Sequence, residues 1–470
     1  MKLLIFGAGE YYERFKKWIA KEEVVALLDN SSAKQHTMID GIEVLAPQEG
    51  VTRDYEAVII MSFYIKAMKK QLIELGVPTE RIFHFYDLRK LIKLTENRQK
   101  IEYYGITEQE LRKDAKTRIG LLSTDLALGG TAIALFHMAE VLKKQGYPIV
   151  FASMMDGPLR TRLEEQDIPV IIDPNLQLST MRETEWLSDF RLILCNAINY
   201  YIFLSERDLQ IPMIWWLHDS AFFYDGVDRD VLRRILQENL TVLSVGPVPE
   251  RAIHSIMPEL QVEQLLYGVE DIERKAERAG RQDKVCYVTI GSIEERKGQD
   301  VLLQAVCLLP EEIRSNAVFY LIGNDTSLLA GQIKEKARAM PEIILTGGVG
   351  REKIHEILEK ADVMICPSRE DPMPTVAAEA MSHKVPCIVS DVTGTASYIR
   401  EGRNGLTFEN GNAGELADKM EWCIENRTAL AEMGNRAREI YESVFSMERF
   451  EEEVNKVVCK SLGSAHLLDQ

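Results

Sequence analysis

Short apolar runs alternate with helical stretches in two successive blocks of this chain, residues 117–281 and residues 282–445. The predicted strands of the first block are 119–123, 149–153, 170–172, 192–195, 213–217 and 242–245, and those of the second lie near Val285, Val318, Ile343, Val363 and Ile388. Strands that are apolar throughout are typical of a parallel sheet that helices cover on both faces. The pattern therefore predicts an α/β chain with two such domains, whose ligands bind outside the carboxyl ends of the strands.

One segment of the second block carries two acids at a defined spacing. The apolar run 363–366 leads into a proline-containing loop, and the stretch after it favours a helix that Pro374 can open. The free N–H groups in the first turn of such a helix make an anion site above the strand ends. Asp371 in the loop and Glu379 in the helix flank this place. A ligand with hydroxyls at both ends and a charge in the middle, such as a sugar nucleotide, has the matching form.

The segment resembles the signature of retaining glycosyltransferases of family 4, in which an acid is followed by seven residues and a glutamate; these enzymes have the two-domain GT-B fold. Other landmarks follow in the family's order: Gly129-Gly130, His218, Tyr267-Gly268-Val269-Glu270 between the blocks, and Lys297-Gly298. Each motif alone is weak evidence, whereas all of them in order are strong evidence. The resemblance covers roughly residues 117 to 460.

The resemblance implies a hexosyltransferase-type enzyme that moves a sugar from a nucleoside diphosphate donor to a glycan, lipid-linked or protein acceptor. It assigns catalysis to His218, Lys297, Asp371 and Glu379, and donor binding to Gly129, Gly130, Ser292, Arg296, Gly347, Pro374, Thr375, Val376 and Glu379. Lys297 and the amides near Thr375 would stabilise the leaving diphosphate. We expect no metal and no cofactor, with a UDP-sugar as co-substrate.

Four positions depart from the family's pattern. Asp371 stands where a glutamate is usual, and Ser292 where a cation is usual, with Arg296 as a candidate replacement. Thr395 and Lys384 stand where glycine is common. A left-handed conformation at Lys384 would cost about 1 kcal/mol.

Three further blocks flank the two main ones: residues 1–88 predict a small Rossmann-like domain, residues 89–116 a charged helical linker, and residues 446–470 a C-terminal crossover helix and tail. The first block contains Gly7, Gly9 and Asp29 of a dinucleotide fingerprint, but Tyr12 occupies the third glycine position. A dinucleotide-dependent enzyme built on this block is therefore disfavoured, and we assign the block no chemistry.

The composition of the chain disfavours several classes of binding partner. A net charge of −17 disfavours nucleic acid and broad adhesion to anionic lipid. The seven scattered cysteines contain no Cys-x-x-Cys pair and indicate neither a disulfide framework nor a zinc site. No apolar run approaches the roughly 20 residues that span a bilayer, and Met1 leads directly into a predicted strand. We expect a cytoplasmic protein and leave peripheral membrane association, a homo-oligomer and a partner transferase open.

Simpler interpretations compete with the site assignments. Asp228-Arg229-Asp230 matches a metal-binding pattern of another glycosyltransferase fold, but helix capping explains it better. His137, His254, His355 and His383 are interpreted as structural, and Trp215-Trp216 as core. The alternative function is a catalytically silent, transferase-like subunit that binds and stabilises an active partner.

Overall fold

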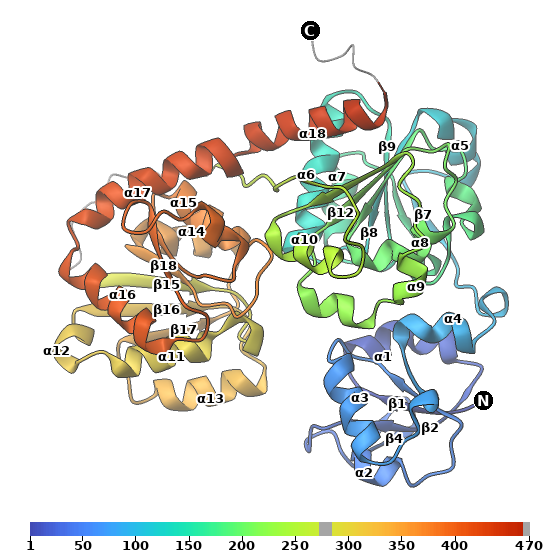
Figure 1. The fold of residues 1–470 in the computed structure, drawn as a ribbon, viewed down its shortest axis with the longest axis horizontal. Coiled ribbons are helices and arrows are strands. Elements are labelled where there is room, and N and C mark those ends of the chain that lie inside the picture. Colours follow the sequence, from blue (N-terminus) through green and yellow to red (C-terminus); the bar gives the residue numbers. More distant parts are fainter. Residues whose placement is uncertain (272–283, 464–470) are drawn as a thin grey trace. The chain divides into compact units, whose positions relative to one another are not determined.

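The computed structural model describes residues 1–271 and 284–463 (Figure 1). The chain divides into two compact units: residues 1–242 with 252–261, and residues 243–251 with those from 262 onward. The boundary predicted at 281/282 and the end of the predicted tail lie outside the described residues. Three sheets organise the described chain.

The first sheet belongs to the N-terminal residues and has the strand order β3-β4-β2-β1-β5-β6. Its strands are β1 (Lys2–Phe6), β2 (Glu23–Leu28), β3 (Met38–Ile39), β4 (Ile42–Leu45), β5 (Ala57–Ile60) and β6 (Ile82–His84). The accompanying helices are α1 (Glu10–Phe15), α2 (Pro47–Gly50), α3 (Ile65–Glu74) and α4 (Leu88–Leu91). All pairs are parallel except β3 with β4. This block is thus a small α/β domain.

The second sheet has the order β14-β13-β12-β11-β8-β9-β10-β7. Its strands are β7 (Glu102–Tyr104), β8 (Ile119–Ser123), β9 (Ile149–Ser153), β10 (Val170–Ile172), β11 (Leu192–Asn196), β12 (Met213–Leu217), β13 (Leu240–Ser244) and β14 (Val262–Gln264). Its helices are α5 (Glu108–Lys113), α6 (Gly130–Lys144), α7 (Leu159–Glu165), α8 (Tyr201–Ser205), α9 (Arg229–Leu232) and α10 (Pro247–His254). Strands β8 to β12 are fully buried along their length, which explains why their sequences are continuously apolar.

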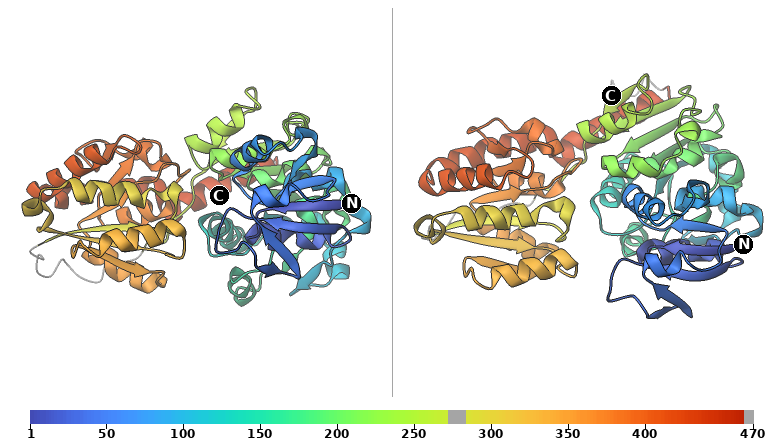
Figure 2. Two further views of the ribbon diagram at one scale, coloured as in Figure 1. Left: turned by 90° about the horizontal axis from the view of Figure 1, so that it is seen from below. Right: turned by 60° about the horizontal axis from the view of Figure 1, so that its bottom comes forward.

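The third sheet is parallel throughout, with the order β17-β16-β15-β18-β19-β20. Its strands are β15 (Val285–Ile290), β16 (Ala317–Ile322), β17 (Ile343–Gly347), β18 (Val363–Cys366), β19 (Cys387–Ser390) and β20 (Gly405–Phe408). The helices are α11 (Gln299–Leu308), α12 (Glu311–Arg314), α13 (Leu328–Ala337), α14 (Arg351–Lys360), α15 (Thr375–Ser382), α16 (Ala413–Glu425), α17 (Ala429–Ile440) and α18 (Met447–Ser461). Helices lie on both sides of this sheet (Figure 2).

The predicted fold class is confirmed, and the strands of the two main blocks lie where the apolar runs predicted them. The segment 89–116 differs from the helical linker that we expected. Between α4 and α5 it contains β7, which pairs antiparallel with β10 and extends the second sheet. The helix predicted near 447–462 is present as α18; that it crosses back onto the first main domain stays a prediction.

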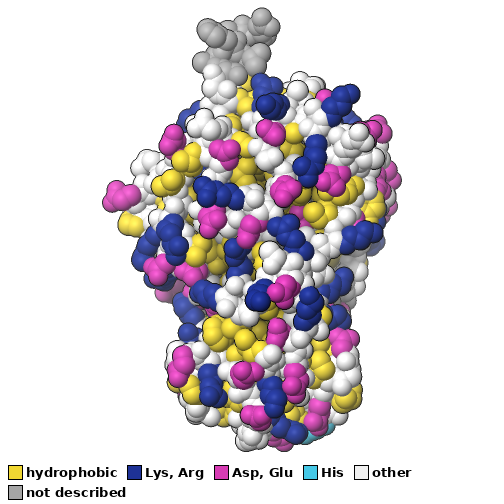
Figure 3. Space-filling model, turned by 90° about the vertical axis from the view of Figure 1, so that its right-hand side faces the viewer, with side chains coloured by type: hydrophobic (Ala, Val, Ile, Leu, Met, Phe, Trp, Pro, Cys, Tyr) yellow, Lys and Arg dark blue, Asp and Glu magenta, His cyan; other side chains and the backbone are white. Residues whose placement is uncertain are grey.

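Charges of both signs are interspersed on the face shown in Figure 3. Within the described residues, no helix is both long and apolar enough to cross a membrane.

Lys384 follows α15 with a φ of 56°, so it adopts the left-handed conformation that its sequence position predicted. A side chain with a Cβ is strained there, whereas glycine is not. The chain accepts this strain at the turn that leads from α15 into β19.

We expect Lys384→Gly to stabilise the second unit by about 1 kcal/mol, because glycine removes the left-handed strain. The matched substitution Lys336→Gly in α13 should destabilise it by about 1 kcal/mol, because it introduces glycine into a helix. Chemical denaturation of both variants measures the two shifts. Shifts of the same sign would contradict the strain at Lys384.

Candidate functional site

The loop between β18 and α15 builds the centre of the candidate site. Pro374 is the N-cap of α15, with extended backbone (φ −66°, ψ 112°). The first N–H groups of a helix lack acceptors within the helix, so those of Thr375 and Val376 point outward from the helix end. The described residues place no capping side chain there. The start of α15 is therefore suited to an anion, as the sequence predicted.

An ion pair connects this loop to the loop after β15. Lys297 Nζ lies 2.6 Å from Asp371 Oδ2, and the Asp371 residue is 6% exposed. Arg296 Nη1 lies 3.7 Å from the same oxygen and also donates to the Glu370 carbonyl. Arg296 thus lies at the site, as a replacement for the cation missing at Ser292 requires. Ser292 itself is exposed.

Gly298 fixes the position of Lys297. Its φ is +68°, and a Cβ at this residue would come within 2.0 Å of the Pro367 carbonyl oxygen. Any other residue would push apart the two loops that carry Lys297 and Asp371. The Lys-Gly pair in the sequence therefore has a steric reason.

Glu379 has two different carboxylate oxygens. Oε1 accepts a hydrogen bond and ion pair from Arg351 Nη1, whereas Oε2 is buried without a hydrogen-bond partner among the described residues. The residue is 6% exposed. A buried carboxylate oxygen without a partner is costly, so a ligand hydroxyl that donated to Oε2 would be bound favourably.

Sequence reasoning missed Arg351. It is the first residue of α14, which follows β17 and the glycines around Gly347. Like Thr375, Arg351 begins a helix that follows a parallel strand. This position in the sequence pattern could have identified Arg351 as a candidate site residue.

The site residues of the second unit meet at one edge of the third sheet. Ser292 and Lys297 follow β15, Gly347 ends β17, and Asp371 follows β18. Because these strands are parallel, their carboxyl ends share an edge. The predicted donor-binding residues of the second unit are thus brought together, whereas Gly129 and Gly130 belong to the first unit.

Tyr267 ties the turn between the blocks to this edge. Its hydroxyl donates to the Met373 carbonyl at 2.6 Å. Burial, with further contributions from the negative charges of Asp371 and Glu379, holds the pKa of Tyr267 well above its ordinary value. Both carboxylates therefore lie near one buried hydroxyl.

The remaining predicted residues belong to the first unit. Gly129 is the N-cap of α6, which begins at Gly130 after β8, and His218 follows β12. These parallel strands end at the same edge of the second sheet. The His218 ring packs on Trp216 with 4.2 Å between centroids, and its Nε2 is buried without a hydrogen-bond partner in the described chain. Removal from water lowers the pKa of His218 to about 3, so the ring is neutral.

The competing interpretations of other motifs are resolved by their contacts. Asp228 caps α9 by accepting from the N–H groups of Asp230 and Val231, as predicted. Trp215 and Trp216 are fully buried in the core. Among the residues that the structure describes, no group of three or more His, Cys, Asp or Glu could hold a metal ion.

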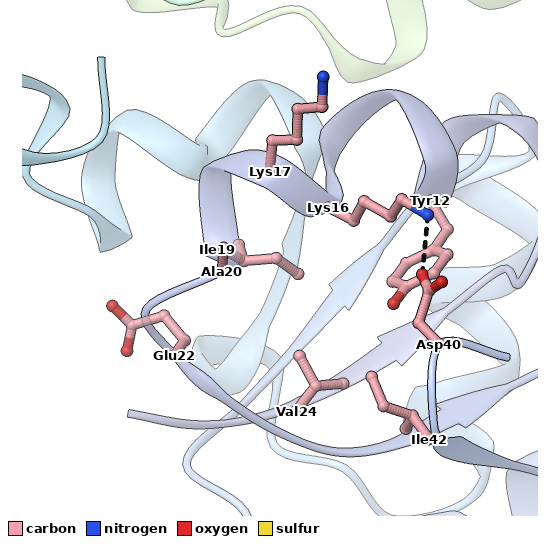
Figure 4. A pocket seen from close by; sticks show the side chains of 9 residues that line it. All are labelled: Tyr12, Lys16, Lys17, Ile19, Ala20, Glu22, Val24, Asp40 and Ile42. Carbon is pink, nitrogen blue, oxygen red and sulfur yellow. Dashed lines mark hydrogen bonds and ion pairs between the residues drawn. The ribbon is translucent and has the colours of Figure 1, made fainter. Parts of the chain in front are cut away.

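The glycine turn of the N-terminal sheet is filled by its own side chains. Asp29 accepts from the Ala8 amide and from Lys34, whose Nζ also donates to the Ala8 carbonyl. A pocket in this domain lies elsewhere and is lined by Tyr12, Lys16, Lys17, Ile19, Ala20, Glu22, Val24, Asp40 and Ile42 (Figure 4). Lys16 and Asp40 pair with each other in it at 2.8 Å. The disfavoured dinucleotide site gains no support from these contacts.

Comparison with known proteins agrees with this geometry. Residues 270–440 match the family described as Glycosyl transferases group 1, and residues 1–83 match one described as C2185-like, N-terminal. The first match contains Lys297, Arg351, Asp371 and Glu379. The second unit thus carries a glycosyl transferases group 1 domain, and the fold is GT-B with an additional N-terminal α/β domain.

Individual relatives are distant. The chain is 22% identical over 281 residues to alpha-D-kanosaminyltransferase of Streptomyces kanamyceticus, covering 54% of this chain and 71% of that protein. It is 25% identical over 171 residues to the lipopolysaccharide glucosyltransferase WaaG of Escherichia coli, covering 36% of this chain and 42%, less than half, of that protein. The structure of Anabaena HepE in complex with UDP and glucose is similar, with a TM-score of 0.62 at 17% identity over 73% of this chain and all of that one. This structural likeness shows the fold.

Asp219, next to His218, gives the first unit a testable pH dependence. Its Oδ2 accepts from the Ile198 amide at 2.7 Å, and burial raises the pKa of Asp219 to about 6. Because the native state then favours the protonated acid, this group's contribution falls by about 3 kcal/mol as the pH rises from about 4 to about 6.

Asp219→Asn should remove this fall. We expect the variant to be more stable than the wild type by up to about 3 kcal/mol at pH 7 and nearly equal to it at pH 4. Denaturant unfolding at a series of pH values, followed by tryptophan fluorescence, measures the difference, and Asp189→Asn controls for loss of an exposed charge. A difference that does not change with pH would contradict the assignment.

Proposed function

We propose that this chain transfers a sugar, with retention of anomeric configuration, from a nucleoside diphosphate sugar to an acceptor. The observation that carries the proposal is the arrangement around α15: an uncapped helix N-terminus, a buried carboxylate in the preceding loop that pairs with Lys297, and a second buried carboxylate in the helix, one oxygen of which has no partner among the described residues. The family match of residues 270–440 supports it.

Each side chain has a role in this proposal. Lys297 and the amides of Thr375 and Val376 stabilise the negative charge that develops on the leaving diphosphate as the glycosidic bond lengthens. Asp371 binds hydroxyls of the sugar, and Glu379 Oε2 accepts from the ribose hydroxyls. The acceptor oxygen attacks the face that the diphosphate leaves, so no covalent nucleophile from the protein is required.

The acceptor side is proposed for the first unit. His218 contacts the transferred sugar, and the Gly129-Gly130 turn lets the donor phosphate and the acceptor approach the backbone at the start of α6. The acceptor is a glycan, a lipid-linked intermediate or a protein.

The donor base is proposed to be uracil. Structures of the similar Anabaena protein are described as complexes with UDP and with UDP-glucose. We propose no further cofactor, and a cytoplasmic location.

Loss of Lys297 or Glu379 should abolish most of the transfer. We expect Lys297→Ala and Glu379→Ala each to lower turnover about 10² to 10³-fold, because one stabilising group of this kind is worth that factor. Release of nucleoside diphosphate measures turnover, and a single cooperative melting transition without ligand, even at a lower temperature, shows that the variant is folded. Lys353→Ala, which removes an exposed lysine of the same unit, is the control. Wild-type turnover in both site variants would contradict the proposal.

A panel of nucleoside diphosphates tests the base. At a concentration 100-fold over its Kd, the matching diphosphate should stabilise the chain by about 2.7 kcal/mol. We expect UDP to raise the melting temperature more than ADP, GDP or CDP, and we expect Glu379→Ala to remove the shift. An equal effect of all four would exclude recognition of uracil.

The alternative function, a catalytically silent subunit that stabilises an active partner, makes different predictions from the enzyme. It is favoured by exposed Ser292, where the family usually has a cation. A chain that binds UDP, turns over none of the UDP-sugars and co-purifies stably with a second transferase would support it over the enzyme.

A further inference from the structure

The small N-terminal α/β domain contacts the first main domain at the carboxyl edge of the second sheet. Its partners are the segments that follow four successive parallel strands. Arg14 donates to Met154 Sδ (3.7 Å), directly after β9, and to Gln177 Oε1 (3.1 Å), after β10. Tyr86 donates to Asn199 Oδ1 after β11. Ligands of open α/β sheets bind at this edge, so the small domain lies against the place where an acceptor-side site belongs.

On the small domain, the residues that make these contacts also follow strands of their own sheet. Arg14 follows β1, Phe63 follows β5, and Tyr86 follows β6. Segments that follow three parallel strands of the small domain therefore contact segments that follow parallel strands of the second sheet, and part of the edge at which the small domain would bind a ligand is engaged in this contact.

The most extensive contact is with the chain just after His218. Phe63 packs edge-on against Phe223 and Phe222, with centroid distances of 4.5 and 6.0 Å. A Cβ at Gly226 would come within 2.4 Å of Ile65 Cδ1, so the Ile65 side chain packs directly against the Gly226 backbone. Lys66 Nζ pairs with Asp225 at 2.5 Å. Because that ion pair is largely exposed, the aromatic packing contributes more.

A second line of contacts reaches the residue next to His218 through the segment that follows β11. The Tyr86 hydroxyl is buried and donates to Asn199 at 2.8 Å. The neighbouring Ile198 amide donates to Asp219, the residue after His218. Between these contacts and β11 lies Ala197, whose φ of 93° is strained for a residue with a Cβ. A strained backbone of this kind is retained only where surrounding contacts fix it, and the contacts of Asn199 and Ile198 are of this kind.

From this convergence we propose that the small domain is a positioning device for the acceptor side of the transferase, which holds His218 through the segments 197–200 and 219–226. Phe63 and Tyr86 are its positioning residues. The kinetic consequence of this inference rests on the proposed function. A displacement of about 1 Å at a reacting site can lower the reaction rate by a factor of about 10².

Hydrogen exchange tests the mechanical part without any activity. We expect Tyr86→Phe, which removes one hydroxyl, to speed exchange of the amides in 197–200 about tenfold, and Phe63→Ala to do the same for 219–226. Tyr55→Phe is the matched control, because Tyr55 precedes β5 and lies at the opposite end of that strand. Phe63→Leu should restore part of the protection. Unchanged exchange in both contact variants would overturn the inference.

Kinetics test the functional part. Both contact variants should lower kcat for transfer about tenfold or more. UDP affinity should stay at the wild-type value, because neither substitution changes a proposed donor-binding residue and Lys297, Thr375, Val376 and Glu379 belong to the other unit. Tyr55→Phe should keep wild-type transfer. Faster exchange with wild-type kcat would overturn the positioning role, and so would a parallel loss of UDP affinity and kcat. Absence of transfer in the wild-type chain contradicts the proposed function itself and leaves the exchange experiment to decide the mechanical part.

Discussion

The ion pair between Lys297 and Asp371 is the interaction on which the candidate site depends. Asp371 is almost completely buried, and a carboxylate in that position requires a cation within contact distance. The requirement fixes the loop after β15 against the loop after β18, and Gly298 makes room for that approach. With this pair formed, the Lys297 ammonium is held at the loop that leads into α15 without any ligand having to recruit it. If the proposed reaction takes place here, the cation for the leaving diphosphate is therefore in place before the ligand binds.

Parallel sheets explain why residues far apart in sequence meet. Each strand delivers its following loop to the same edge, so Lys297, Arg351, Asp371 and Glu379 converge although 82 positions separate the first from the last. The logic recurs in the first unit, where Gly129-Gly130 and His218 share an edge. It recurs again in the small domain, whose strand ends carry Arg14, Phe63 and Tyr86. In that third case the edge binds another domain instead of a ligand.

The sequence predicted most strands because burial on both faces requires apolar residues throughout, and it predicted the strain at Lys384 and the cap at Asp228 because these are local. It did not predict β7 or the Arg351–Glu379 pair. β7 has only three residues, Glu-Tyr-Tyr, within a highly charged segment, and it becomes a strand because β10 offers a free edge. Arg351 is remote from Glu379 in sequence, so its pairing depends on tertiary structure. The packing of Phe63 against Phe223 lay outside local patterns for the same reason.

Glu379 and His218 each have one buried polar atom without a partner among the described residues, and we propose different roles for them. Glu379 offers a buried acceptor oxygen, and His218 a buried ring nitrogen, neither of which has a partner in the described chain. Leaving such atoms unpaired costs about 1 to 3 kcal/mol each, which ligand hydroxyls can recover. His218 is neutral because removal from water lowers its pKa, so it brings no charge to a phosphate. A neutral imidazole is suited to a sugar hydroxyl, whereas the charge that balances a diphosphate comes from Lys297. In the proposed reaction, recognition of sugar hydroxyls and stabilisation of the leaving group thus fall to different side chains because their charges differ.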